Sequence, residues 1–117
     1  MSIAIAGVTF DASHAKLAAT FWAEALGRTL ADGADETAAA VEADPAVPGS
    51  RIGFRQVPED KKVKNRMHFD LIATADFDAE VKRLTALGAT KLDEVDAGIH
   101  YVTLADPEGN EFDLIAR

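Results

Sequence analysis

The sequence contains no cysteine, which excludes disulfide bonds, thiolate metal sites and cysteine nucleophiles. This absence is typical of proteins in the reducing cytoplasm, and we expect a cytoplasmic location. Basic residues are also few, because 12 lysines and arginines stand against 20 aspartates and glutamates, giving a net charge of −8. Since nucleic-acid-binding proteins need basic side chains to neutralise phosphates, we expect no nucleic acid as a partner.

Long apolar runs are missing as well. No stretch approaches the roughly 20 apolar residues that a membrane helix requires, so we expect no membrane partner. Hydrophobic residues nevertheless make up 48% of the 117 residues, which is enough for the core of one domain of common size.

Two segments, 13–26 and 76–87, carry apolar side chains at the three- and four-residue spacing that predicts amphipathic helices. Polar residues that favour helix starts precede each stripe, and a glycine follows each one. The expected caps and ends are Ser13 and Gly27 for the first helix, and Asp76 and Gly88 for the second. The apolar stripes are Leu17, Ala18, Phe21, Trp22, Ala25 and Leu26 in the first helix, and Phe77, Val81, Leu84 and Leu87 in the second.

The other apolar segments are short and separated by turn signals such as the Asp-Pro-Glu-Gly at 106–109, which predicts strands. The expected strands are 3–10, 37–42, 51–57, 66–73, 90–95, 99–105 and 111–116, with a further short one at 28–31.

The chain also contains an internal repeat. The Leu-Gly at 26–27 matches the Leu-Gly at 87–88, and the Ala-Asp-Pro at 43–45 matches the one at 105–107. The repeat predicts a single α+β domain over 1–117, made of module one at 1–58, a charged connector at 59–65 and module two at 66–117. We expect two βαβββ modules that form a curved, partly closed mixed sheet, with the helices on its convex side and a concave cup.

Three stretches in this order resemble the vicinal oxygen chelate superfamily, which includes glyoxalase I, bleomycin-resistance proteins and extradiol dioxygenases. They are FWAEALG at 21–27, KNRMHFDL at 64–71 and DPEGNEF at 106–112, and the resemblance covers essentially the whole chain. It points to the glyoxalase-like branch. It implies a small-molecule ligand in the cup, a homodimer and, in the enzymes, a divalent metal held by the first and last strands of each half.

The second half offers suitable metal ligands. Alternation along strands places His68 and Asp70 on the same face of one strand, and Glu111 and Asp113 on the same face of another. The resemblance gives His68 and Asp113 the positions of the metal ligands in this half. Imidazole and carboxylate groups are both proper ligands for a divalent ion.

The first half offers no counterparts, because Gly7 stands where His68 stands in the repeat and Gly53 stands where Asp113 stands. Metal enzymes commonly use three protein ligands and an open position, so this predicts a degenerate or absent metal site. Asp70, Glu111, Thr9 or donors from a dimer partner could complete the set.

Other residues are candidates for ligand binding or catalysis. Asp70 could orient His68 as a general base, or the two could form a purely structural pair. Arg55 and Arg66 could bind a carboxylate or phosphate through paired N–H groups, or could neutralise the acidic residues of the cup. Glu111 is expected to face the cup. His100 could donate to a ligand or pack at the rim.

We therefore expect a small-molecule-binding protein of the glyoxalase and bleomycin-resistance type, with no cofactor or with a divalent metal ion. The alternative is a metal-dependent lyase, isomerase or dioxygenase that acts on vicinal oxygens. A third hypothesis is metal-free acid–base catalysis by His68 and Asp70.

Overall fold

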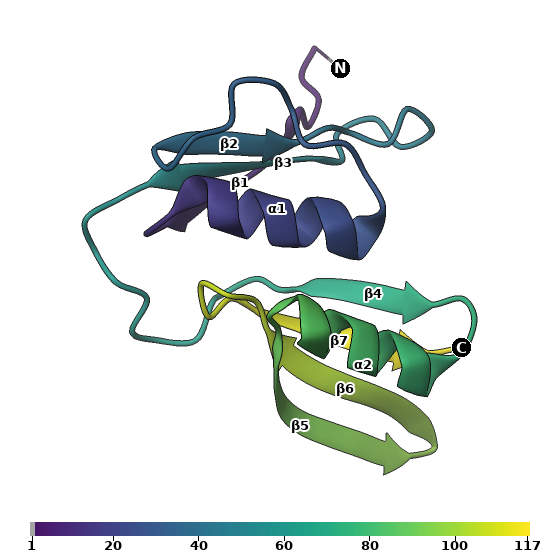
Figure 1. The fold of residues 1–117 in the computed structure, drawn as a ribbon. Helices are drawn as coiled ribbons and strands as arrows, with labels where there is room; N and C mark the ends of the chain where they lie inside the picture. The colour runs from purple at the N-terminus through teal and green to yellow at the C-terminus, as the bar shows by residue number, and fades with distance from the viewer. Residues whose placement is uncertain (1) are drawn as a thin grey trace. The chain divides into compact units, whose positions relative to one another are not determined.

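The computed structural model describes residues 2–117, and its contacts divide the chain between Asp60 and Lys61 into two units (Figure 1). Within the described residues, neither helix combines the length and the apolar character needed to cross a membrane.

The first unit contains one helix and a three-stranded sheet (Figure 1). Its elements are β1 (Gly7–Ala12), α1 (Ala15–Leu26), β2 (Ala38–Val41) and β3 (Arg51–Gln56). The strand order is β1-β3-β2, with β1 parallel and β2 antiparallel to β3. The short strand expected at 28–31 is reduced to one bridge between Leu30 and Val41. Alternate residues of β3, Ile52 and Phe54, are buried in this unit's core.

Helix α1 keeps its predicted end but not its predicted cap. The N-cap is His14 and not Ser13, because the His14 Nδ1 accepts the Leu17 N–H at 3.4 Å and satisfies one of the free donors of the first turn. Gly27 ends the helix with a φ of 64°, as predicted. Trp22 is buried, whereas Leu17 is 61% exposed. At 100° per residue, Leu17 lies on the opposite side of the helix from the buried alanines and Trp22.

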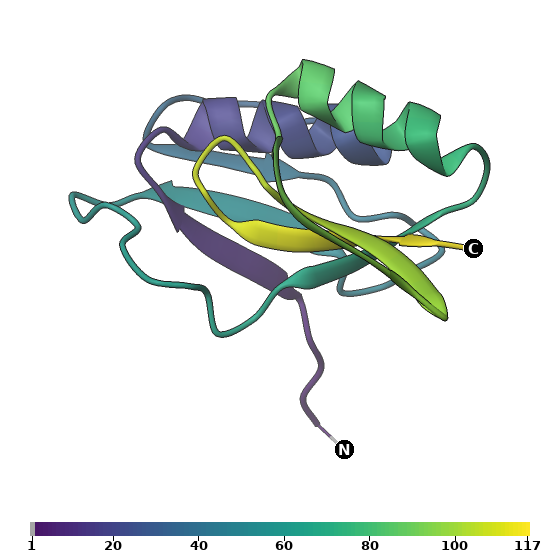
Figure 2. The same cartoon turned by 90° about the horizontal axis from the view of Figure 1, so that it is seen from below.

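The second unit is a complete βαβββ module (Figure 1). Its elements are β4 (Phe69–Ala73), α2 (Phe77–Leu87), β5 (Thr90–Ala97), β6 (Ile99–Ala105) and β7 (Glu111–Ala116). The strand order is β4-β7-β6-β5, with β4 parallel to β7 and the other pairs antiparallel. Helix α2 runs along one face of this sheet (Figure 2). The α+β class with two repeated modules is thus confirmed, and the strands form two sheets, neither of them closed.

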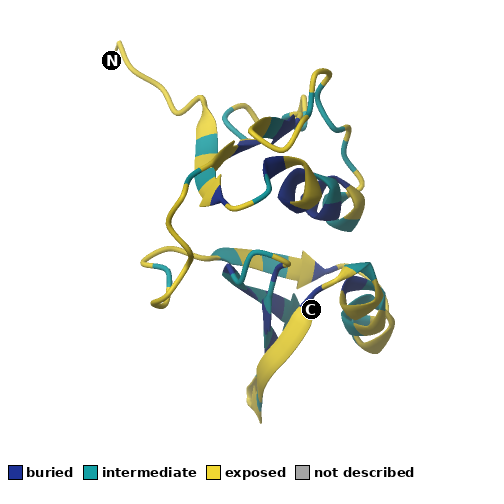
Figure 3. Ribbon diagram, turned by 60° about the vertical axis from the view of Figure 1, so that its left-hand side comes forward, coloured by how far each residue is buried: buried dark blue, intermediate teal, exposed yellow. Residues whose placement is uncertain are grey.

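Helix α2 has the predicted ends. The Asp76 carboxylate accepts the Ala79 N–H at 3.1 Å, and Gly88 ends the helix with a φ of 125°. Leu84 is the buried residue of this helix. The core of the second unit lies on β6 and β7, while β5 is mostly exposed (Figure 3). Its large buried side chains on these two strands are Val102, Leu104, Phe112 and Leu114.

The first strand of each unit starts later than predicted. Strand β1 begins at Gly7 instead of residue 3, and β4 begins at Phe69 instead of residue 66. The ladder with the parallel partner strand begins with Gly7 and Arg51 in the first unit and with Phe69 and Phe112 in the second, so the residues before Gly7 and Phe69 have no partner in these ladders. Met67 precedes the strand and is 72% exposed. As a result His68 also lies just outside β4.

Candidate functional site

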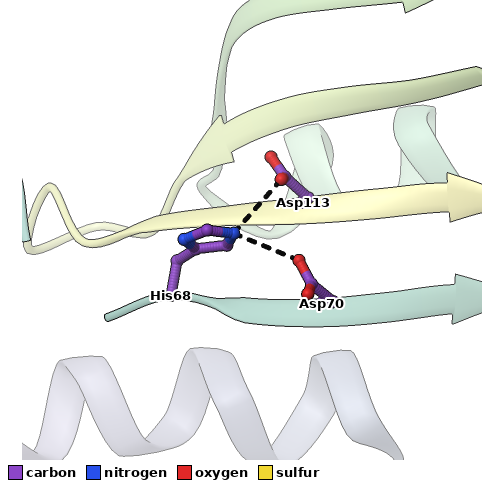
Figure 4. A group of neighbouring side chains, drawn as sticks. All are labelled: His68, Asp70 and Asp113. Atoms are coloured by element: carbon purple, nitrogen blue, oxygen red, sulfur yellow. Dashed lines mark ion pairs between the residues drawn. The ribbon is translucent and has the colours of Figure 1, made fainter. Parts of the chain in front are cut away.

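Three polar side chains of the second unit converge, namely His68, Asp70 and Asp113 (Figure 4). We call them the trio. The His68 Nε2 lies 3.2 Å from the Asp70 Oδ1 and 3.4 Å from the Asp113 Oδ2. The two aspartates are direct partners in the parallel ladder of β4 and β7, which places their side chains on the same face. The sheet register therefore holds two carboxylates side by side, and the His68 ring lies within ion-pair distance of both.

The trio lies on the face of the sheet opposite α2. Phe112 and Leu114 flank Asp113 in sequence and are buried on the helix side, so alternation directs Asp113 to the other side. The Thr103 hydroxyl donates a hydrogen bond to the Asp113 Oδ1 at 2.5 Å. Asp113 is thereby fixed and only 20% exposed, whereas Asp70 is 59% exposed. The trio is therefore accessible to solvent from the side of Asp70.

The geometry of the trio fits a divalent cation. One ligand atom from each side chain lies within 4.8 Å of the other two. Two ligand atoms at right angles around an ion at about 2.1 Å are separated by roughly 3 Å. The two distances from the His68 Nε2, 3.2 and 3.4 Å, are close to that value. Asp70, one of the replacement ligands considered from the sequence, is the side chain that brings the number of donors to three.

The first unit has no such group at the equivalent place. In its parallel ladder Thr9 pairs with Gly53, where the second unit pairs Asp70 with Asp113. The repeat alignment made by counting residues is therefore reproduced by the strand register. A Cβ on Gly7 would lie 2.5 Å from the Arg51 carbonyl oxygen, and a Cβ on Gly53 would lie 2.9 Å from the Thr9 Oγ1. Neither position has room for a donor side chain without a local shift.

Residues 7–115 match a protein family described as the glyoxalase-like domain. The chain belongs to this family. The membership agrees with the superfamily resemblance found in the sequence. Among curated proteins, none matches this sequence.

Solved structures share the fold of this glyoxalase-like domain. A glyoxalase/bleomycin resistance protein/dioxygenase family enzyme from Burkholderia phytofirmans PsJN is 19% identical with a TM-score of 0.74, over 97% of this chain and 98% of that one. A glyoxalase-related enzyme from Fulvimarina pelagi is 15% identical with a TM-score of 0.71, over 100% and 89%. Lactoylglutathione lyase from Agrobacterium tumefaciens is 16% identical with a TM-score of 0.65, over 97% and 92%. At these identities the likeness establishes the fold.

Glu111 of the glyoxalase-like domain is engaged by the segment that precedes β4. Its carboxylate accepts hydrogen bonds from the Lys61 ammonium group at 2.9 Å and from the Asn65 backbone N–H at 3.1 Å. Burial raises the pKa of Glu111, but the hydrogen bonds from Lys61 and Asn65 outweigh that effect and hold the pKa below its ordinary value of 4.5. These bonds compete with the predicted role of Glu111 as a ligand-binding residue.

His100 is separated from the trio. Thr103 shares the face of Asp113, and His100 is three residues away on β6, so alternation directs it to the helix side. There its ring lies 4.6 Å from the Phe77 ring of α2, and its Nε2 lies 2.7 Å from the Glu94 carboxylate. The structure therefore places His100 where it packs at the helix.

The two candidate arginines are exposed. Arg66 precedes β4 by three residues, and Arg55 lies on β3 of the first unit, on the same face as Gly53. The acidic residues that these arginines were expected to neutralise lie close to other side chains. Glu111 forms an ion pair with Lys61, and both trio carboxylates face His68.

Sequence reasoning missed Thr103 and the contact between Asn65 and Asn110. Thr103 gave no signal, because its bond to Asp113 depends on the pairing of β6 with β7. Asn65 and Asn110 are joined by a side-chain hydrogen bond of 2.8 Å. Both asparagines lie in the stretches at 64–71 and 106–112, which carry the family resemblance. Nothing in the sequence indicated that the two stretches are in contact.

Proposed function

We propose that this glyoxalase-like domain binds a small molecule on the helix-free face of its second unit, with the trio as the polar anchor. The observation that carries the proposal is the unequal repeat. The ladder that pairs Asp70 with Asp113 in the second unit pairs Thr9 with Gly53 in the first. Polar chemistry is therefore concentrated on one half of the domain, in agreement with a ligand-binding protein whose family metal site is degenerate.

Without a metal, the trio provides an oriented histidine. His68 lies within ion-pair distance of two carboxylates, so a ligand that contacts its ring meets a group whose orientation is fixed. Apolar surface adjoins it. Ile72 shares the face of Asp70, is 58% exposed, and pairs in the ladder with Ile115. A few polar groups beside apolar side chains are typical of small-molecule sites.

A second candidate function is metal-dependent chemistry on a substrate with adjacent oxygens. The close grouping of three ligand atoms favours it. A divalent ion held by His68, Asp70 and Asp113 would bind such oxygens and stabilise negative charge that develops on them. The three side chains would hold the ion from one side and leave its other positions open.

A titration followed by ¹H–¹⁵N NMR separates the two functions. Catechol, which carries two adjacent hydroxyl groups, is added to the apo protein and then to protein loaded with Zn²⁺. The proposal expects catechol to shift amide signals around residues 68–72 and 111–115 without metal, and His68→Ala to abolish these shifts.

The matched control is His100→Ala, because His100 lies on the opposite face of the same sheet. It should leave the catechol response unchanged. Shifts that require Zn²⁺ would establish the second function in place of the first. If catechol gives no response with or without Zn²⁺, or an equal response in both variants, neither function is supported.

A further inference from the structure

A network of hydrogen bonds joins the segment before β4 to the turn before β7. The Asn65 side-chain amide donates to the Asn110 Oδ1 at 2.8 Å, and the Asn65 backbone N–H donates to the Glu111 carboxylate at 3.1 Å. The Asn110 amide in turn donates to the Asp106 carboxylate at 3.1 Å. We call Asn65, Asn110, Glu111 and Asp106 the connector clamp.

The clamp rests on a rigid turn. Asp106 and Asn110 are buried, at 3% and 6% exposure. The Asp106 carboxylate also accepts the backbone N–H groups of Glu108 and Asn110, both at 2.9 Å. Because the Asn110 side-chain nitrogen donates to Asp106, the Asn110 side-chain oxygen is oriented to accept the hydrogen bond from Asn65. Buried polar groups that are fully paired in this way fix a single arrangement.

The clamp lies immediately before the histidine of the trio. His68 precedes the first ladder pair, Phe69 with Phe112, so strand pairing does not hold it. The two residues between Asn65 and His68 are exposed. The path of the backbone at His68 is therefore set by the start of β4 on one side and by Asn65 on the other.

The other end of the clamp lies beside the third member of the trio. Glu111 is two residues before Asp113 on the same strand, and its partner Asn65 is three residues before His68. The clamp thus ties together the beginnings of the two parallel strands that carry the trio.

In the first half, where the trio is missing, the positions of Asn65 and Glu111 are also occupied by other residues. In the repeat alignment that sets Gly7 against His68, Ala4 stands where Asn65 stands. In the alignment that sets Gly53 against Asp113, Arg51 stands where Glu111 stands. A side chain needed only for the folding of the module would be expected in both copies.

We propose that Asn65 and Glu111 are positioning residues that hold His68 between Asp70 and Asp113. The inference rests on the proposed function only in assigning ligand binding to the trio. The position of His68 itself can be measured without any ligand.

The experiment compares Glu111→Ala with the conservative variant Glu111→Gln, whose amide oxygen can still accept the Asn65 N–H. Nuclear Overhauser contacts between the His68 ring and the side chains of Asp113 and Thr103 report the position of the histidine. Catechol or Zn²⁺ titration reports binding. Glu111→Ala should weaken these contacts and reduce affinity about tenfold, as loss of groups that orient a ligating histidine commonly does. Glu111→Gln should restore both.

Two further variants make the outcome decisive. Lys61→Met removes the ion pair to Glu111 and the Lys61 hydrogen bond to the Val63 carbonyl but leaves the Asn65 bonds, and it should behave like the wild type. Asn65→Ala removes the side-chain bond to Asn110 and tests the clamp independently if Glu111→Ala does not fold. Unchanged His68 contacts in both alanine variants overturn the proposal. Normal contacts in the wild type without binding of either probe overturn the proposed function and leave the positioning role standing.

Discussion

Placing an alanine at Gly7 tests why the first half of the domain lacks a donor. A Cβ there would lie 2.5 Å from the Arg51 carbonyl oxygen, roughly 0.5 Å closer than such contacts occur in proteins. The obstacle is backbone of the paired strand, so the β1–β3 ladder itself must shift. Overpacking of this kind costs about 1–3 kcal/mol, and the loss of glycine's freedom in the unfolded chain returns about 0.4–1 kcal/mol. We therefore expect Gly7→Ala to lower the free energy of unfolding by about 1–2 kcal/mol.

Fluorescence of Trp22 provides the assay. It is the single tryptophan, is 1% exposed and belongs to α1, so urea unfolding followed at this residue reports on the first unit. Gly53→Ala is the matched control, because its Cβ would meet the Thr9 hydroxyl at 2.9 Å, the end of a side chain that can rotate. It should cost less than Gly7→Ala, and in a Thr9→Ala background it should become neutral or stabilising by a few tenths of a kcal/mol.

A Gly7→Ala protein as stable as the wild type would refute this reasoning. The Arg51 carbonyl would then leave room for a side chain, and the absence of a donor at the repeat position equivalent to His68 would have no steric cause. Equal costs for Gly7→Ala and Gly53→Ala would refute the distinction between a backbone obstacle and a side-chain obstacle.

Other predictions concern charge, capping, packing and assembly. The pKa of Glu111 is lower in the folded than in the unfolded chain, so its stabilising effect is present above about pH 4.5 and is lost as the pH falls through the folded-state value. The difference in unfolding free energy between wild type and Glu111→Gln should accordingly shrink from about pH 7 to pH 3. Asp76→Ala should cost about 1 kcal/mol in thermal unfolding, because the first turn of α2 loses its cap. Leu84→Ala should cost about 2–5 kcal/mol, since Leu84 is the buried residue of that helix, and a smaller loss would show that α2 is loosely attached. The homodimer expected from the family resemblance is tested by light scattering, where a stable monomer would contradict it.

Much of the local structure was predictable because it depends on neighbours in sequence. The glycines that end both helices, the Asp76 cap and the bounds of β6 and β7 follow from spacing and turn chemistry. The equivalence of Gly7 to His68 and of Gly53 to Asp113 in the repeat was also predictable, because each strand keeps a fixed distance along the chain from its helix or turn. The error at the first helix, Ser13 in place of His14, arose because two adjacent side chains could both accept an N–H.

The candidate site was only partly predictable. His68 and Asp113 were identified by motif, and Asp70 by alternation, but their convergence depends on the parallel register of β4 with β7. His100 lies on the helix side, and its contact with Phe77 could not be foreseen without the placement of α2. Glu111 was predicted to face a ligand, yet its carboxylate is hydrogen-bonded to Lys61 and Asn65, which lie 50 and 46 positions earlier in the chain.

The sequence by itself determined the α+β class, the two-part repeat and the lack of donor side chains in the first half, because composition and short-range periodicity encode these features. Only the tertiary structure decided which polar side chains meet. Hydrogen-bonded pairing between distant strands sets those contacts, and a shift of one residue in register would direct Asp70 and Asp113 to opposite faces of the sheet.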